Sequence, residues 1–556
     1  MELKHFHGIA PRYPSQNLQG VSAEVAENVK LWHGTLAPWR APKHIKDSTH
    51  TTKTIYQVGC CWFEWDACVE VAEWVVDCPR LYVTGDGDYP YVMALKDDCA
   101  TGCAEMSKTR LGVPAPKNRP QMTRLHIPTP PNGKDSLPRS EMREQRAYVY
   151  TYVNCLGEES APSFASNEQD IDDGEPVSIT GFLTPPSEFG ITHIRIYRRV
   201  TGHRSDTEAM GATPLMTDFY HVGTIEVGTA TFIDKGLNID TLGEALTTFD
   251  VLEPPAGLRG ILAVPNTRIL VGFDGNTLCF SMNNQPYNWP ESRRYNLDDN
   301  IVAIRESGGM LYVMTDGHPY VVEIDAGDDI RTCQSILRLP TPMPMITCCS
   351  AKGALSTPMG VFYVSSKGLV RLAQGAITVV TMPWFASDDW RELKPETMRL
   401  GYAHGAIFIV SDTHAFVFFT DDATYGDSDA YRLTTIDLHP RDMVTGRNGE
   451  LFMLLGNGIY QWDAGARFMP YRWKSAKIKS TRYGYFGAIR LWGSGSVDVS
   501  IFAEAQTVLS AIPLRPQTSY RLPRYGHHLH HQIELAGIHT IESVELANTR
   551  WDLSKV

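Results

Sequence analysis

The sequence has no long apolar run and no surplus of cationic residues. No stretch reaches the 18 apolar residues of a membrane helix, and the opening MELKHFHGIAPRYP has no signal-peptide core, so we expect no membrane or targeting segment. With 51 Lys and Arg against 63 Asp and Glu, the net charge is −12. This excludes a tight, sequence-reading DNA-binding protein. It suits a surface past which DNA slides, because such a surface repels phosphate weakly.

Recognisable catalytic and cofactor motifs are also missing. The chain has no GxGxxG after a strand, no GxxxxGK[ST], no GxSxG and no HExxH. This favours a structural or binding protein over an enzyme, and we expect no cofactor. The 11 cysteines include no CxxC pair, so they do not indicate a zinc site. We interpret them as free, buried thiols of a protein made in a reducing cytoplasm.

Strand-forming and turn-forming residues are abundant. Hydrophobic residues make up 43% of the 556 residues, 24 are Tyr and 12 are Trp, while 45 Gly and 35 Pro interrupt the chain every few positions. This composition is typical of short strands joined by tight turns. The length requires more than one hydrophobic core. The sequence therefore predicts an all-β protein of several domains.

The first half of the chain divides into four predicted segments. Residues 1–45 are predicted to be an extended arm with one short helix, SAEVAENVKLW, capped by Ser22 and ordered against another surface. Residues 46–105 form strands that end in the hairpin pattern LYVTGDGDYPYVM. Residues 106–140, with seven prolines from position 112 onward, form a linker. Residues 141–256 form an inserted β-sandwich of immunoglobulin or fibronectin type III style.

A repeat dominates residues 257–468. Steps of 42, 51, 45 and 45 residues separate five run-turn-run patterns, whose turns lie at Asp274, Asp316, Lys367, Asp412 and Asn457. A period of about 40 to 50 residues with four strands each is typical of β-propeller blades. We expect five to six blades, with residues 46–105 closing the ring; the alternative is that these residues form a separate β-domain. Residues 469–556 are predicted to be a C-terminal β-sandwich.

Five of the 18 histidines lie in residues 526–539. His528, His530 and Glu534 share one face of a predicted strand, which is a geometry that metal ligands use. An ordinary polar sheet face is the expected explanation, and a pH-sensitive interface is a further alternative. His531 faces the apolar side and is interpreted as a core residue.

Acidic residues recur at the predicted turns, and two of them could be combined into the carboxylate pair of a glycosidase. Asp-Gly is also a favoured hairpin turn, which explains these residues without chemistry. Residues 421–429, DDATYGDSD, contain enough carboxylates for Ca²⁺ but are interpreted as a solvated loop. We therefore predict no catalytic residues and no metal. The acidic positions considered are Asp86, Asp88, Asp274, Asp298, Asp299, Asp316, Asp421 and Asp422.

Four segments together resemble the tail nozzle proteins of short-tailed bacteriophages, also called tail hub or tail tubular protein B-like proteins. The segments are HGIAPRYPSQNLQGVSAEVAENVKLWHGTLAPWRAPK, YVYTYVNCLGEESAPS, YRWKSAKIKSTRYGYFGAIRL and RLPRYGHHLHHQIELAG. The resemblance spans most of the chain in the same order. The chain departs from the pattern at His531, where such proteins tend to have Trp, and in the cysteine-rich stretch 60–103.

The resemblance implies a virion tail protein, synthesised in the host cytoplasm. It implies a homo-oligomeric ring, commonly a hexamer, below the portal and adaptor, in contact with tail fibre or other tail proteins. Viral double-stranded DNA would pass through the ring without sequence-specific binding. Two rival hypotheses of other classes are a receptor- or carbohydrate-binding propeller at the tail tip and a propeller hydrolase.

Overall fold

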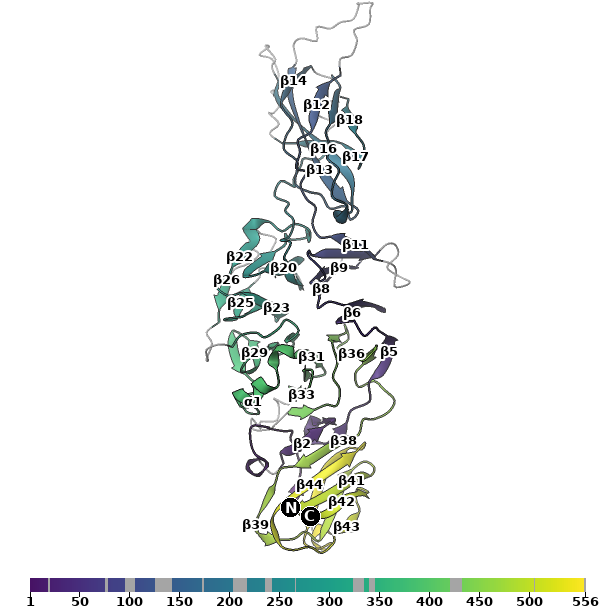
Figure 1. Cartoon of the computed structure of the whole chain (residues 1–556), viewed down its shortest axis with the longest axis vertical. Helices are drawn as coiled ribbons and strands as arrows, with labels where there is room; N and C mark the ends of the chain where they lie inside the picture. Colours follow the sequence, from purple (N-terminus) through teal and green to yellow (C-terminus); the bar gives the residue numbers. More distant parts are fainter. Residues whose placement is uncertain are drawn as a thin grey trace, which may run out of the picture. The chain divides into compact units, whose positions relative to one another are not determined.

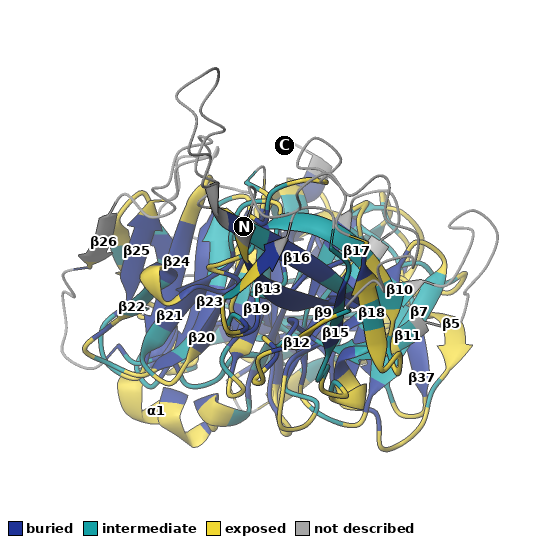
Figure 2. Cartoon of the chain, turned by 90° about the horizontal axis from the view of Figure 1, so that it is seen from above, coloured by how far each residue is buried: buried dark blue, intermediate teal, exposed yellow. Residues whose placement is uncertain are grey.

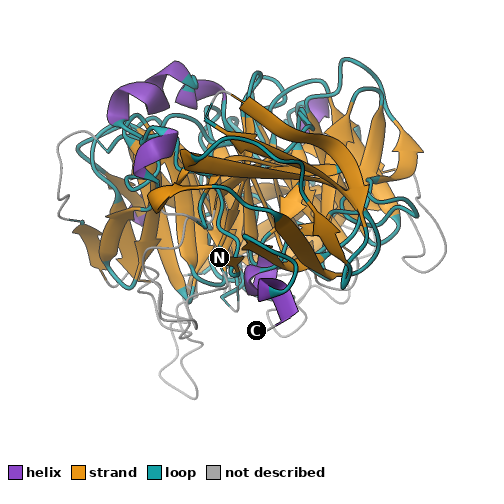
Figure 3. Ribbon diagram, turned by 90° about the horizontal axis from the view of Figure 1, so that it is seen from below, coloured by secondary structure: helices purple, strands orange, loops and turns teal. Residues whose placement is uncertain are grey.

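The computed structural model divides the chain into two compact units. Figure 1 shows the strands and helices, coloured along the sequence. Unit 1 comprises Met1–Val69, Asp299–Asp325 and Cys333–Val556, and unit 2 comprises Glu70–Asp298 and Ala326–Thr332. The structure describes residues 1–554 apart from 19–20, 76–78, 96–105, 126–142, 173–174, 204–217, 236–242, 266, 324–334, 340–345, 421–432 and 505. Strands dominate both units, and the helices are short, as Figure 3 shows. The chain is thus an all-β protein built from many small sheets.

Most of the described part of unit 1 between residues 301 and 461 forms four runs of antiparallel strands. Three of the runs are consecutive in sequence: β23 (Ile301–Ser307), β24 (Met310–Thr315), β25 (Tyr320–Glu323) and β26 (Ser335–Arg338); β27 (Ala354–Thr357), β28 (Gly360–Ser365), β29 (Gly368–Ala373) and β30 (Ala376–Val379); β31 (Arg399–Ala403), β32 (Ala406–Val410), β33 (Ala415–Phe419) and β34 (Leu433–Thr435). The fourth run has β35 (Met443–Thr445), β36 (Leu451–Leu455), β37 (Gly458–Gln461) and, as its outer strand, β5 (Lys43–Asp47).

The middle strands of these runs are covered on both faces. Every residue of β28, β32 and β33 is buried. Figure 2 shows that other strands, such as β5, are exposed. The sequences of the three buried strands, GVFYVS, AIFIV and AFVFF, are continuous apolar runs rather than alternating ones, as expected for strands with a neighbouring layer on each side. The sheets therefore stack face to face and hide each other's apolar side chains.

All five predicted hairpins of the repeat are confirmed. Each predicted turn joins the second and third strands of a four-stranded run, at Asp274, Asp316, Lys367, Asp412 and Asn457. The upstream pattern LYVTGDGDYPYVM is also a hairpin, formed by β9 (Pro79–Thr84) and β10 (Tyr91–Leu95). The turn chemistry and the apolar runs were sufficient to locate these hairpins.

The first strands of the runs in unit 1 contact one another in sequence order. β23 contacts β27, β27 contacts β31, and β31 contacts β35. β35 in turn contacts β6 (Thr54–Val58), which pairs with β7 (Cys61–Trp65). The beginnings of four of these strands, β6, β27, β31 and β35, therefore lie close together.

Within residues 1–45, the described segments contain strands that pair with later strands of unit 1, rather than forming a free arm. The short helix predicted after Ser22 is wrong, because these residues form β2 (Ala23–Glu27) and β3 (Val29–Lys30). β2 pairs with β38 (Tyr471–Ser475), and this pairing overrides the helix propensity of the segment. The segment's apolar side chains are buried within the chain's own core. These buried residues include Leu3, Phe6, Ile9, Ala26, Val29, Leu36 and Trp39.

The remaining strands near the N-terminus are short. They are β1 (Glu2–Leu3), β3, and β4 (Ala37–Pro38), with two 3-10 turns at Ser15–Asn17 and Trp32–Gly34. β1 pairs with β45 (Ile541–Ala547), so the two ends of the chain share a sheet.

The C-terminal residues form two facing sheets whose side chains share one core. One sheet has the order β1, β45, β40 (Ala488–Gly493), β43 (Ser519–Arg521). The other contains β2, β38, β44 (His528–Gly537), β41 (Val497–Ala503) and β42 (Gln506–Leu514), with β39 (Ile478–Gly484) paired to β44. Through β2 this second sheet continues into β34 by one parallel bridge, Glu27 to Thr435. A single ten-stranded sheet results.

Unit 2 contains two four-stranded sheets of the same form. They are β8 (Glu70–Val75), β9, β10 and β11 (Met106–Arg110), and β19 (Arg259–Val264), β20 (Ile269–Asp274), β21 (Thr277–Phe280) and β22 (Arg294–Asn296). Their first strands, β8 and β19, contact each other, and Trp74, Tyr82 and Trp289 belong to their shared core.

A second pair of sheets in unit 2 forms a β-sandwich. The strands are β12 (Gln121–Arg124), β15 (Val177–Thr180) and β18 (Thr231–Asp234) on one side and β14 (Gln169–Asp172), β13 (Arg143–Asn154), β16 (Ile191–His203) and β17 (Tyr220–Glu226) on the other. Tyr148, Tyr150 and Tyr152 point into the core between the sheets because strand side chains alternate. The buried Arg198 and Asp234 form an ion pair at 2.9 Å, and Tyr148 donates to Asp234 at 2.7 Å.

Two strands lie in the segment predicted as a linker. β11 (MSKTR) and β12 (QMTR) contain no proline, whereas the irregular stretch between them contains Pro114, Pro116 and Pro120. Proline removes the amide donor that a sheet needs, so the prolines confine the irregular backbone to the residues between the strands.

The longest helix among the described residues is α1 (Ser387–Glu392). None of the described helices has the length and apolar character that crossing a membrane requires.

Candidate functional site

The histidine cluster does not form a metal site among the described residues. His528 pairs with Glu504 at 3.3 Å, while the Glu534 carboxylate accepts a hydrogen bond from Arg472 at 3.0 Å. The described part of the chain contains no group of three His, Cys, Asp or Glu residues placed to hold a metal ion. His528, His530 and Glu534 therefore lie on a sheet face where two of the three have protein partners.

His531 is buried on the opposite side of β44, as predicted. Only 1% of its surface is exposed, and its ring packs edge-on against Phe486 at 4.8 Å. Burial lowers the pKa of His531 below its usual value, and the neighbouring His528 adds to this effect. The imidazole is thus held neutral as an aromatic core residue.

The acidic turns carry local structural hydrogen bonds. Asp86 accepts bonds from Tyr91 at 2.8 Å and Lys108 at 3.0 Å; burial raises its pKa, but these bonds outweigh burial and leave the pKa lowered. Asp316 accepts bonds from the backbone and side chain of Asn300. Side-chain hydrogen bonds of this kind stabilise the conformation of a turn. Asp421 and Asp422, with the predicted loop 421–429, lie outside the described residues.

The cysteines differ in part from the prediction of free, buried thiols. Cys279 is buried, and burial raises its pKa to about 11. Cys60, Cys68 and Cys155 are exposed, and Cys61 is disulfide-bonded. Their positions next to turns explain the exposure, because turn residues face solvent.

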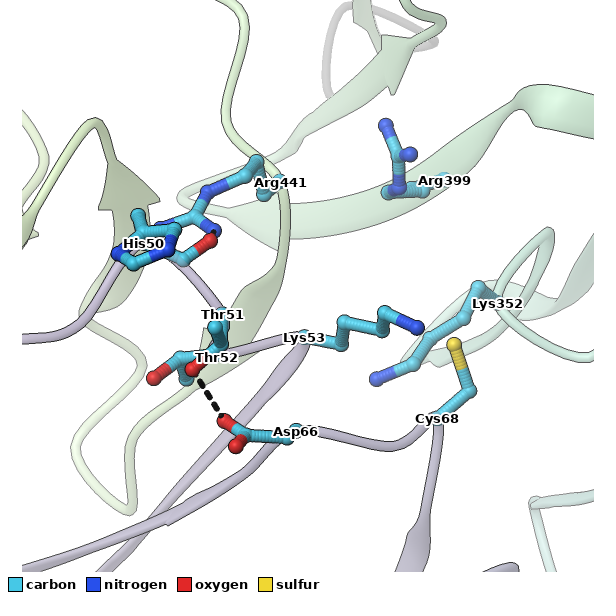
Figure 4. Close-up of a pocket in the computed structure, with 9 residues that line it drawn as sticks. All are labelled: His50, Thr51, Thr52, Lys53, Asp66, Cys68, Lys352, Arg399 and Arg441. Atoms are coloured by element: carbon cyan, nitrogen blue, oxygen red, sulfur yellow. Dashed lines mark hydrogen bonds between the residues drawn. The ribbon is translucent and has the colours of Figure 1, made fainter.

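A pocket of about 630 Å³ in unit 1 gathers cationic side chains from the beginnings of four strands (Figure 4). Lys53 directly precedes β6, Lys352 lies just before β27, Arg399 is the first residue of β31, and Arg441 lies just before β35. Because these first strands contact one another, their beginnings converge. We call this cavity the strand-start pocket.

The cations of the strand-start pocket differ in how far they are neutralised. Lys352 donates to the buried Asp442 at 2.8 Å, and Arg399 to the exposed Asp412 at 3.1 Å. Arg441 donates to the carbonyl oxygens of Thr49, His50 and Gly456 rather than to a carboxylate.

Lys53 is the least neutralised of these cations. Its ammonium group has no ion pair or side-chain hydrogen bond with any residue that the structure describes, and the residue is exposed. Asp66 is the acidic side chain in the lining, and it accepts a hydrogen bond from Thr51 at 2.8 Å. Positive charge therefore exceeds negative charge in this pocket.

The loop that carries Lys53 is held in place by hydrogen bonds. Ser48 and Thr52 donate to the Glu64 carboxylate at 2.5 and 3.2 Å, and Lys46 donates to the same group at 2.7 Å. Burial raises the pKa of Glu64, but these bonds outweigh it, so the pKa is lowered and the group stays ionised. The wall of the pocket is thus preformed.

The sequence contains a pattern that indicates three of the four cations of this pocket, and this pattern lies outside the turns themselves. Lys352, Arg399 and Arg441 stand 15, 13 and 16 residues before the turns at Lys367, Asp412 and Asn457. Aligning the repeats on their turns would have shown a cation at the start of three successive first strands. Lys53 lies outside the repeat and gave no such signal.

No protein-family model matches the chain, and neither does any curated protein sequence. Among solved structures, the extracellular domain of the hybrid two component system BT4673 from B. thetaiotaomicron is similar at 13% identity and a TM-score of 0.25, over 59% of this chain and 41% of that one. The AfRom2 CNH domain is similar at 8% identity and a TM-score of 0.25, over 58% and 90%. Hsv2 of Kluyveromyces marxianus is similar at 11% identity and a TM-score of 0.23, over 50% and 69%. This chain thus spans less than half of the BT4673 domain.

Proposed function

We propose that the chain is a structural subunit of the tail nozzle of a short-tailed bacteriophage. In this role it forms a homohexameric ring below the portal and adaptor and extends the DNA ejection channel. It helps to retain the genome and then to release it. The resemblance of four segments, in the same order along the chain, supports this assignment.

The observation that carries the proposal is the way the N-terminal residues tie unit 1 together. β1, β2 and β5 each pair with strands that lie more than 400 residues later in the chain. Each addition covers a sheet edge, and covered edges resist both fraying and unwanted pairing. A stiff, self-contained block of this kind suits a segment of channel wall.

We further propose that the four-stranded sheets are blades of a closed propeller with five to six blades, to which residues 46–105 contribute. Closure removes the exposed edges of the first and last blades. The net charge of −12 lets double-stranded DNA pass without sequence-specific binding. The protein acts without catalysis, and its localisation is the virion tail.

The proposal predicts that the full-length chain assembles into a ring with the portal and adaptor proteins of a short-tailed bacteriophage. We would co-express it with them, measure subunit number by native mass spectrometry and locate it by cryo-electron microscopy. We expect six copies around the DNA exit path. The chain without these partners is the control and is expected to stay monomeric at low concentration.

A density located at the tail tip, away from the exit path, would contradict the proposal and favour the receptor-binding alternative. Binding of the isolated chain to host cells or glycans would point the same way.

A further inference from the structure

The strand-start pocket brings together the ammonium groups of Lys53 and Lys352. Lys53 and Lys352 extend toward the same space beside Cys68, as Figure 4 shows. Asp442 neutralises Lys352, whereas Lys53 has no such partner among the described residues. Like charges that share a cavity repel each other, and an anion between them removes that repulsion.

The pocket keeps a positive surplus after its partners are counted. Four cations line it, and Asp66, Asp442 and Asp412 oppose them, which leaves one positive charge. The surplus stands out on a chain with a net charge of −12. An anionic ligand would therefore be attracted to this cavity rather than to most of the surface.

The donors that remain match a phosphoryl group. Among the described residues, no side chain takes an ammonium proton of Lys53, and Lys352 uses one of its three for Asp442. A phosphoryl group offers three oxygens in different directions, whereas a carboxylate offers two in one plane.

The size and rigidity of the pocket also suit a ligand. Its volume of about 630 Å³ exceeds what a bare phosphate fills and lies within the usual range for small-molecule sites. The hydrogen bonds of Ser48 and Thr52 to Glu64 hold the loop before Lys53 in position. Preformed donors lose little entropy when a ligand binds.

We propose that the strand-start pocket binds a phosphoryl group, carried by a small phosphorylated molecule or by a nucleic-acid strand, with Lys53 and Lys352 as its ligands. The proposal does not rest on the tail nozzle assignment, because the pocket lies within unit 1 of a single chain.

The test is isothermal titration of the full-length chain at constant ionic strength with sodium pyrophosphate and, separately, with a short single-stranded DNA. Lys53→Gln is the test variant, because Lys53 is exposed and its replacement leaves no buried group of the described residues unpaired. Lys43→Gln is the matched control, because it removes the same charge from the exposed strand β5 of the same unit. We expect Lys53→Gln to weaken binding about tenfold, as the loss of one charge-assisted hydrogen bond predicts, and Lys43→Gln to leave it unchanged.

The two ligands distinguish the source of the phosphoryl group. Lys53-dependent binding of pyrophosphate assigns the pocket to small phosphorylated molecules, and Lys53-dependent binding of DNA alone assigns it to a strand. Either result supports the proposal. Absence of binding by both ligands, equal affinities of the two variants, or equally tight binding of citrate would overturn it. Circular dichroism verifies that each variant is folded.

Discussion

At the scale of single residues, Glu24 shows how strand β2 is held in place by polar contacts. Its carboxylate accepts hydrogen bonds from Gln532 at 2.6 Å and Lys474 at 3.0 Å, so it links β2 to β44 and β38. Burial raises its pKa, but the bonds from Ser15, Lys474 and Gln532 outweigh burial and lower the pKa to about 2. The ionised form of Glu24 therefore stabilises the docked N-terminal segment.

The lowered pKa of Glu24 predicts that the folded chain loses stability in acid. Because the pKa of Glu24 is lower in the folded chain than its usual 4.5, its contribution is present above pH 4.5 and is lost as the pH falls toward 2. The side chain is about one-third exposed, so solvent screening reduces the contribution to about 1 kcal/mol. Glu24→Gln should lower the urea midpoint at pH 7 and shrink the difference between pH 7 and pH 3.

Glu392→Gln, a change at an exposed acid on α1, should leave both midpoints unchanged. An identical acid response in wild type and Glu24→Gln would show that Glu24 is not the residue responsible.

At the scale of secondary-structure elements, the sequence predicts hairpins better than strands with distant partners. The five hairpins of the repeat follow from local signals: an apolar run, a turn and a second run. β2 and β5 have no such signal, since EVA and KHIKD carry charge and their partners, β38 and β37, are hundreds of residues away. Their strand state depends on pairing partners that local sequence patterns do not reveal.

The candidate site was harder to predict than the fold. The histidines of β44 attracted a metal hypothesis because they are close in sequence, yet Glu534 pairs with Arg472 and His531 is buried. The cations of the strand-start pocket are far apart in sequence, and only the contacts between first strands bring them together. Proximity along the chain is thus a poor guide to proximity in this fold.

At Gly8 the N-terminal segment lies directly against Leu433 of β34. A Cβ at Gly8 would lie 2.1 Å from the backbone oxygen of Leu433, which is too close for any side chain. Gly8→Ala should therefore push the segment away from β34 and destabilise the chain by about 1–3 kcal/mol. We expect a lower urea midpoint and faster tryptic cleavage after the exposed Arg12.

Gly526→Ala is the control, because the nearest atom to its added Cβ is the tip of the His528 ring at 3.3 Å. If both variants unfold at the same urea concentration, close approach at Gly8 does not limit stability.

At the scale of the whole molecule, the sandwich of unit 2 has cores of its own. Its main core draws on strands from β12 to β18, and a second cluster around Val149, Tyr197 and Phe219 covers the outer face of the larger sheet. Most of these strands pair antiparallel with other strands of the same sandwich, which are near them in the sequence. Such local pairing favours independent folding.

We therefore expect residues 112–252 to fold when expressed alone. A cooperative thermal transition, together with near-ultraviolet circular dichroism from the buried Tyr148, Tyr150 and Tyr152, would verify this. Asp234→Ala should abolish the transition, because it leaves the buried Arg198 without its ion-pair partner at a cost of about 3–5 kcal/mol. Asp170→Ala, on the exposed side of β14, should retain it. A non-cooperative wild-type fragment would contradict the expectation.

The placement of β1, β2 and β5 has a consequence for biosynthesis. These strands leave the ribosome first, but their partners β37, β38 and β45 begin only at residue 458. At the usual speed of translation, roughly 20 to 110 s pass before those partners emerge. During that time the nascent N-terminal segment must stay soluble without its pairing strands. The sheets that contain β1, β2 and β5 can form only when synthesis of the chain is nearly complete.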